Sequence, residues 1–304
     1  MKRLLGTTAT LLLLSAGASW AGDQVVINQD FEPDIPQLND LFIHGNIVNN
    51  AGFDVTNVAN QIVYEDTSAD AGTTGDLYTF VQDIGDDEAQ LNEVTVSACC
   101  SSVGVDGTAT NVANTVLLQD LDGNGTSADV VDVDQSDVGD RFRQINDIAV
   151  LATTSPMGRI TGAGAGSGNH LVSDLVANNS LNSVTYIDDG GGTTPIDFTV
   201  DQDLNGTHGL VQRNDIDVRA NAGVENGVNV DASNRLNTVA GLWSNQAGSG
   251  TVNIDQDAGD RTRQENLITI EGDNDGGVIT AAVNNPMASA LNAANTVQVS
   301  MPDM

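Results

Sequence analysis

Basic residues are nearly missing from this chain. Lys2 is the only lysine, and Lys and Arg together number 10 against 42 Asp and Glu. The formal net charge of −32 repels the phosphates of nucleic acids and the headgroups of anionic membranes. We therefore exclude nucleic acid as a partner and expect the field of the chain to favour divalent cations or a high-salt medium.

Aromatic residues are also scarce, at 4% of the chain, whereas glycine is abundant at 32 residues. A conventional core of large side chains is therefore not expected, and the scattered Gly and Pro argue against long helices. Disorder is the alternative for so acidic a chain. However, Val and Ile recur at regular spacing, which favours an ordered fold.

Cysteine and histidine are too few to suggest a metal centre or a catalytic site. Cys99 and Cys100 are adjacent, which leaves free thiols, a bond between neighbours or a crosslink to another chain open. The three histidines, His44, His170 and His208, stand in unrelated contexts, with no zinc-type spacing and no nucleophile elbow. We therefore expect no enzymatic activity.

One apolar run, near the N-terminus, has the features of a secretory signal peptide over residues 1–21. Lys2 and Arg3 precede the run Leu11–Leu14, and Ser19-Trp20-Ala21 supplies small residues at the −3 and −1 positions of a cleavage site. No later apolar run is long enough to span a bilayer. We expect residues 22–304 to be an exported repeat domain.

A strand–turn–strand pattern organises that domain. In Gly248–Gly276, the alternations Val252/Ile254 and Leu267–Ile270 flank a turn rich in Gly and Asp. The pattern occurs five times, each time marked by two Gln and by an Asn two residues after the second Gln: Gln29, Gln37, Asn39; Gln82, Gln90, Asn92; Gln135, Gln144, Asn146; Gln202, Gln212, Asn214; and Gln256, Gln264, Asn266. Such a period indicates that one supersecondary unit is stacked several times.

The five units cover approximately residues 24–75, 76–128, 129–194, 195–248 and 249–302. The second half of each unit carries an Asn-x-x-Asn motif followed by a β-prone run, as in Asn57–Asn60 and Ile62–Tyr64. The third unit is longer because it contains the insertion Thr153–Gly168. We predict an all-β fold, a repeat β-solenoid or β-arcade of five strand–turn–strand units with cross-β stacking. Whether one unit makes one long rung or two shorter ones stays open.

The recurring amides suggest their own role. Each Asn has the same strand parity as the apolar residues that follow it, such as Ile268 and Ile270, so that it lies on their face of the strand. A buried amide must form hydrogen bonds or cost a few kcal/mol. Stacking like amides from unit to unit gives each one a donor and an acceptor, as in the Asn/Gln ladders of cross-β packing. We predict such a structural ladder for the fifteen residues given above.

Aspartates follow the first Gln of four units, at Asp30, Asp83, Asp203 and Asp257. In register they would repel one another unless they were protonated, paired with nearby Arg or bridged by cations. Two runs resemble the opening of a calcium-binding loop, because oxygen ligands stand at alternate positions, although the final Glu of such a loop is missing. The first run is Asp201, Asp203 and Asn205, and the second is Asp120, Asp122 and Asn124. We therefore expect no cofactor other than weakly bound Ca²⁺ at these runs, with solvated turn acids as the alternative.

The segments Gly259–Ile270 (GDRTRQENLITI) and Gly139–Val150 (GDRFRQINDIAV) resemble the Gly-Asp-x-x-x-Gln-x-Asn repeats of Fap-type functional-amyloid subunits. More loosely, they resemble the repeats of curlin, the curli subunit. The resemblance implies rungs of a cross-β fibre, exported through the outer membrane of a Gram-negative-type bacterium into the biofilm matrix.

On this basis the expected function is a secreted structural subunit of an extracellular curli/Fap-like fibre that serves in biofilm and adhesion. Its expected partners are further copies of itself, outer-membrane export machinery, and host or matrix surfaces. The alternative is a monomeric calcium-binding β-solenoid, acting as an adhesin or a surface-layer protein.

Overall fold

A computed structural model describes residues 24–31, 36–45, 51–66, 77–99, 104–120, 129–153, 173–188, 196–204, 208–220, 228–243, 251–272 and 287–300. Every element in this part of the chain is a β-strand. The all-β class expected from the sequence is thus confirmed. No helix in the described ranges is long and apolar enough to cross a membrane.

The strands form three sheets. The first sheet contains β1 (Gln24–Phe31), β4 (Leu77–Ile84), β7 (Asp129–Asp134), β11 (Ile196–Asp203) and β14 (Val252–Asp257). The second contains β2 (Gln37–Gly45), β5 (Ala89–Cys99), β8 (Arg143–Thr153), β12 (Val211–Ala220) and β15 (Arg263–Gly272). The third contains β3 (Ala51–Asp66), β6 (Val105–Asp120), β9 (Ser173–Ser180), β10 (Ser183–Asp188), β13 (Val228–Trp243) and β16 (Met287–Ser300).

All strand pairs are parallel, and they join equivalent residues of successive units. Gln29 is paired with Gln82 in the first sheet, Asn39 with Asn92 in the second and Asn57 with Asn111 in the third. The chain passes through the three sheets in the same order each time. Each residue range expected for a unit contains one strand of every sheet, except that the third unit supplies both β9 and β10 to the third sheet.

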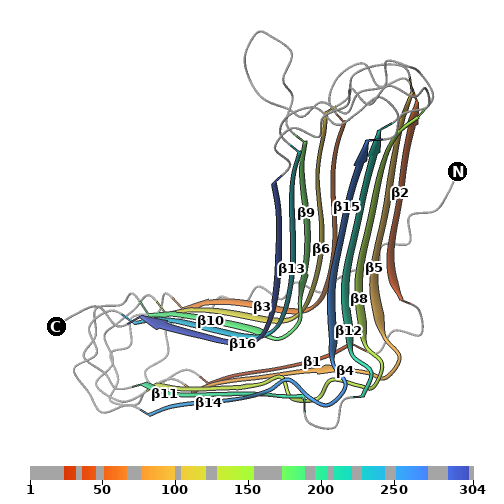
Figure 1. The fold of residues 1–304 in the computed structure, drawn as a ribbon. Coiled ribbons are helices and arrows are strands. Elements are labelled where there is room, and N and C mark those ends of the chain that lie inside the picture. The colour runs from red at the N-terminus through yellow and green to blue at the C-terminus, as the bar shows by residue number, and fades with distance from the viewer. Residues whose placement is uncertain are drawn as a thin grey trace, which may run out of the picture.

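The three sheets form two arms that meet at a corner (Figure 1). The upper arm places the second sheet against the first half of the long strands of the third sheet. The lower arm places the first sheet against their second half. The long strands bend at the corner, where Asn60 and Asn114 have φ angles of 48°. Asparagine tolerates this left-handed backbone better than most residues, which fits its position at the bend.

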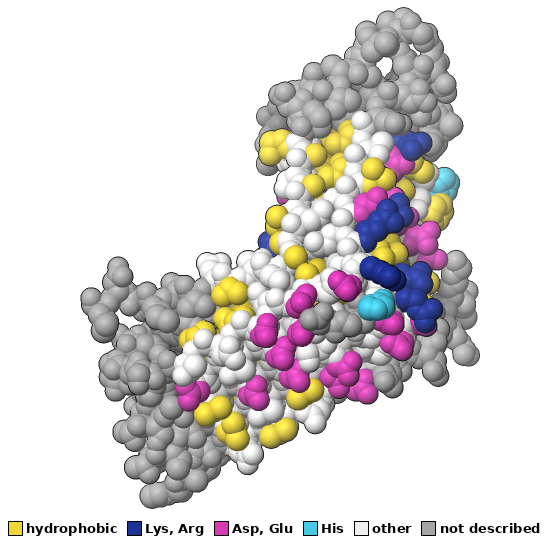
Figure 2. All heavy atoms as spheres, turned by 60° about the horizontal axis from the view of Figure 1, so that its bottom comes forward, with side chains coloured by type: hydrophobic (Ala, Val, Ile, Leu, Met, Phe, Trp, Pro, Cys, Tyr) yellow, Lys and Arg dark blue, Asp and Glu magenta, His cyan; other side chains and the backbone are white. Residues whose placement is uncertain are grey.

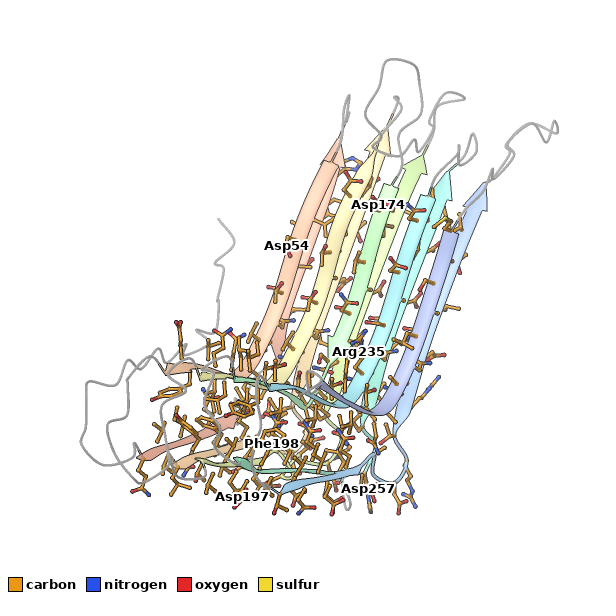
Figure 3. The ribbon with its side chains drawn as sticks, turned by 90° about the vertical axis from the view of Figure 1, so that its left-hand side faces the viewer. Asp54, Asp174, Asp197, Phe198, Arg235 and Asp257 are labelled. Carbon is orange, nitrogen blue, oxygen red and sulfur yellow. The ribbon has the colours of Figure 1, made fainter. Side chains whose placement is uncertain are left out.

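Side chains alternate between the interior and solvent along the strands, as in β4, where every second residue is buried. The upper arm is filled by aliphatic residues such as Val94, Val96 and Ile148. The lower arm is aromatic: Tyr186 and Phe198 stack with ring centroids 5.6 Å apart, and Phe198 lies between its two sheets (Figure 3). The few aromatic residues are thus concentrated in one half of the core.

A third apolar cluster fills the corner and includes Ile84, Phe142 and Leu204. Here the turn of one unit lies directly on the turn of the next. The backbone N–H of Gly139 donates to the carbonyl of Ile84 at 2.7 Å. The corner is therefore as regularly stacked as the strands that it connects.

Candidate functional site: amide columns and open ends

Two columns of glutamine run through the interior from unit to unit. The first glutamine column is Gln29, Gln82, Gln135, Gln202 and Gln256, and the second is Gln37, Gln90, Gln144, Gln212 and Gln264. In both columns each Nε2 donates to the Oε1 of the preceding unit at 2.7 to 2.9 Å. The glutamines of the middle units are buried.

Asparagine forms a third column, which consists of Asn39, Asn92, Asn146, Asn214 and Asn266. Each Nδ2 donates to the Oδ1 of the following unit at 2.8 Å, so the direction is opposite to that of the glutamines. The structure therefore brings together all fifteen amides that the sequence singled out, in three columns.

Two further columns come from the Asn-x-x-Asn motif, which the sequence reasoning used only to mark the units. One is Asn57, Asn111, Asn179, Asn234 and Asn292, with bonds of 2.9 Å, and the other is Asn60, Asn114, Asn182, Asn237 and Asn295, with bonds of 3.0 to 3.1 Å. In both, the Nδ2 also points to the following unit. Their exact recurrence in five units was the signal that could have identified them.

The columns are linked sideways as well as along the stack. Asn92 lies opposite Asn111 across the upper arm, and its Nδ2 contacts the Oδ1 of Asn111 at 3.1 Å and the carbonyl of Thr110 at 3.0 Å. Glutamine Nε2 atoms likewise reach backbone carbonyls, such as that of Val112 from Gln90. These carbonyl contacts fix which terminal atom of each amide is the nitrogen. In the middle units, both N–H groups and the oxygen of each amide are thereby satisfied without water.

Acidic columns lie on the outside of the same sheets. On the second sheet Asp40, Glu93, Asp147 and Asp215 are stacked in register, and Leu267 ends the series in the fifth unit. Partial desolvation raises the pKa of Asp147, and the charges of Asp215, Glu93 and Asp217 add to the rise, while Arg213 opposes it. Because Glu93 interrupts the aspartates and Leu267 ends the series, the column was not apparent from the sequence.

A second acidic column on the first sheet consists of Asp134, Asp201 and Asp255. Desolvation again raises the pKa of Asp201, with contributions from Asp134, Asp203 and Asp255, although a hydrogen bond from the backbone N–H of Asp203 opposes them. Figure 2 shows many of the acidic side chains on the outer face of the lower arm, with most of the visible Arg side chains near the corner.

The arginines expected to offset the aspartates after the first Gln have other partners in the described ion pairs. Arg141 pairs with Asp87, Arg213 with Asp215, and Arg263 with Glu265. These pairs are partly exposed, so that each contributes at most about 1 kcal/mol. They lie near the turns and on the second sheet.

The calcium prediction falls partly outside the described residues. Asn205, Asp122 and Asn124 lie there, and so does the side chain of Asp120. Asp201 and Asp203, which are separated by Gln202, lie at the C-terminal end of β11. In the described ranges no three His, Cys, Asp or Glu residues are grouped so that they could hold a metal ion. Calcium binding therefore stays a prediction.

Several other sequence features lie outside the described ranges. They are the predicted signal peptide over residues 1–21, His170, Cys100 together with the Cys99 side chain, and most of the insertion Thr153–Gly168.

The two ends of the stack are open in the described part of the chain. Strands β1, β2 and β3 pair on one side only, and so do β14, β15 and β16. Figure 3 shows the long strands side by side in chain order, so the first and fifth units form opposite faces. Val252 and Val297, whose equivalents in the middle units are buried, are 44% and 50% exposed. Both ends thus present unpaired strand edges, and the fifth-unit end also exposes core residues, whereas the first-unit core residues Ile62 and Tyr64 are buried.

Comparisons with protein-family models, with curated proteins and with solved structures found no match for this chain.

Proposed function

We propose that the chain is a secreted structural subunit of an extracellular fibre, of the curli or Fap type, that serves in biofilm matrix and adhesion. Its five units form a β-solenoid of the β-arcade kind, and the fibre continues the same stack from one copy to the next. We propose no catalytic role for it. The residues 1–21 and the resemblance of the repeats support export across the outer membrane of a Gram-negative-type bacterium.

The observation that carries this proposal is the pair of open ends. A long unpaired strand edge is a template for pairing with another chain, and soluble proteins commonly protect such edges. Here six strands, β1 to β3 and β14 to β16, offer such edges at the two ends of one stack. With the exception of Val130, every large hydrophobic side chain that is exposed in the described ranges belongs to the first or the fifth unit: Val26, Leu38, Phe42, Val252, Leu267, Met287, Leu291 and Val297.

The negative surface charge regulates assembly in this proposal. Stacked copies bring columns of carboxylates together, and their repulsion opposes growth at neutral pH. The raised pKa of Asp147 and Asp201 means that these groups take up protons more readily than an ordinary Asp. Acid, salt or calcium should therefore accelerate fibre formation, because each reduces the repulsion between carboxylates.

The test uses purified residues 22–304 at neutral and acid pH, with and without millimolar calcium. Electron microscopy and fibre diffraction should show filaments with a meridional reflection near ~4.7 Å, the spacing of paired strands. A chain that stays monomeric under all these conditions would contradict the proposal.

The second candidate is a monomeric calcium-binding adhesin or surface-layer protein, favoured by the acidic column that includes Asp134, Asp201 and Asp255. Calorimetry separates the two functions. A monomer whose melting temperature rises with calcium and that forms no filaments would support the adhesin.

A further inference from the structure

On the basis of the fibre function proposed above, we propose that copies join in one orientation only, with the fifth unit of one copy seated on the first unit of the next. In this arrangement all five amide columns continue across the junction. The partner of each open end is therefore the opposite end of a second copy.

The first unit offers glutamine donors and asparagine acceptors at its open face. Gln29 and Gln37 each donate one N–H to a backbone carbonyl, those of Gln61 and Val58. Glutamines of later units donate a second N–H to the unit before them, as Gln90 does to Gln37. A primary amide has two N–H groups, so each of these two glutamines keeps one donor for a preceding unit. The Oδ1 atoms of Asn39, Asn57 and Asn60 face the same way and lack a donor from a preceding unit in the described contacts.

The fifth unit offers the complementary set. Gln256 and Gln264 donate to the fourth unit, at Gln202 and Gln212, and their own Oε1 atoms receive no such bond within the described part of the chain. Asn292 and Asn295 are exposed, and each donates to one backbone carbonyl, so that each keeps a second N–H. Acceptors in the glutamine columns and donors in the asparagine columns therefore face outward at this end.

Only the joining of unlike ends matches these groups. The fifth unit on the first gives Gln29 N–H to Gln256 Oε1 and Gln37 N–H to Gln264 Oε1, and it gives Asn292 and Asn295 N–H to Asn57 and Asn60 Oδ1. Two first units facing each other would bring N–H against N–H in the glutamine columns and oxygen against oxygen in the asparagine columns. Buried groups left unpaired in this way are costly.

The neighbouring columns fit the same junction. In register, Val252 lies over Val25 and Val297 over Ile62, so these two exposed valines of the fifth unit meet apolar columns of the first, although Ile62 is itself already buried. Two of the acidic columns are interrupted there, because Asp255 lies over Asn28 and Leu267 over Asp40. The column of Asp30, Asp83, Asp203 and Asp257 continues across the junction and places Asp257 over Asp30, so its repulsion opposes growth at neutral pH.

The experiment blocks one face at a time with nearly isosteric changes. The double variant Gln29→Glu with Gln37→Glu removes the two donors of the first face but keeps the oxygens that accept from Gln82 and Gln90. The double variant Asn292→Asp with Asn295→Asp removes donors of the fifth face and keeps the oxygens that accept from Asn234 and Asn237. Circular dichroism and thermal melting establish that both variants are folded.

A charge-matched control is the double variant Gln24→Glu with Thr56→Glu, because it adds the same charge to the first unit at two exposed polar positions outside the amide columns and outside the exposed apolar residues of that face. All variants are studied under conditions in which the unchanged protein forms fibres. We expect each blocked variant to raise the critical concentration for growth at least about tenfold, since two hydrogen bonds are lost and oxygens face oxygens. The control should change it less than about threefold.

Mixing the two blocked variants tests which ends of two copies join. Each blocked variant alone should stay monomeric by sedimentation, whereas an equimolar mixture should form dimers, because one intact fifth face meets one intact first face. Dimers of each variant alone, with no additional species in the mixture, would show that like ends join and would overturn the inference. Fibre growth by both variants at the unchanged rate would also overturn it. In either case the fibre function stands, because only a failure of the unchanged protein to form fibres contradicts that function.

Discussion

The side chain of Asn146 donates to Asn214 at 2.8 Å although 68 residues separate the two. Elsewhere in this column the partners are 52 to 54 residues apart, and the bond is equally long. The additional residues of the third unit fall between β8 and β9, outside the paired strands. The register is thus set by contacts between units, and a change in connection length leaves the column intact because loop closure depends only weakly on length.

Asn146 is the first test of these columns. It is fully buried, its Oδ1 accepts from Asn92 and Asn111, and its Nδ2 donates to the carbonyl of Asn178. Asn146→Ala removes these hydrogen bonds, each worth about 0.5–1.5 kcal/mol net, while Asn92 and Asn111 keep their other partners. We expect a loss of roughly 2–5 kcal/mol in the free energy of unfolding, measured by denaturant titration.

Asn253 provides the control for this variant, because it is exposed on β14 and lies outside the columns. Asn253→Ala should change the free energy of unfolding by less than about 0.5 kcal/mol. Equal effects of the two substitutions would mean that the amide columns contribute nothing specific.

The sequence predicts the columns well because identical residues recur at identical positions. Strand parity places Gln and Asn on the face of the apolar residues, and five repeats of one pattern require one structure repeated five times. The outward column of Asp40, Glu93, Asp147 and Asp215 mixes two residue types and ends in Leu267, so it becomes visible only once the strands are paired.

The path of one unit could not be predicted in the same way. Alternation says which face of a strand is buried, but not which other strand covers it. The arms are separated by a bend at Asn60, whose φ of 48° interrupts a run that otherwise looks like one long strand. That bend sends Tyr64 into the aromatic arm, while Val55, before the bend, packs in the other arm, whose core is aliphatic apart from Phe53.

The raised pKa of Asp147 predicts how stability depends on pH. Because its folded-state pKa lies above the unfolded value, the ionised carboxylate destabilises the fold at neutral pH, and this cost disappears as the pH falls through the folded-state pKa. Asp147→Asn should therefore stabilise the protein at pH 7, and the difference should vanish below about pH 4, the ordinary pKa of Asp.

Urea titrations at a series of pH values measure the Asp147→Asn effect. Asp132→Asn, at an exposed position of β7 on the first sheet, is the control. If Asp147→Asn raised the free energy of unfolding equally at every pH, the effect would not come from the charge of the carboxylate. Desolvation contributes most to the raised pKa of Asp147, and the charged groups that act on it are Asp215, Glu93 and Asp217, which raise the pKa, and Arg213, which lowers it.

The turns at the corner are stacked as closely as the strands, and Gly139 tests this. A Cβ at Gly139 would lie 2.3 Å from the backbone carbon of Gly85 in the turn of the preceding unit, so that the backbone itself must move. A Cβ at the exposed Gly52 would meet its nearest neighbour at 3.7 Å, an ordinary contact. We expect Gly139→Ala to cost about 1–3 kcal/mol of stability, as overpacking does, while Gly52→Ala costs less than about 1 kcal/mol. Separating the stacked turns also weakens the hydrogen bond from the Gly139 N–H to the Ile84 carbonyl. Hydrogen exchange at Arg143, whose N–H donates to the Glu88 carbonyl of the preceding unit, reports on the same separation. This exchange should accelerate in Gly139→Ala but not in Gly52→Ala.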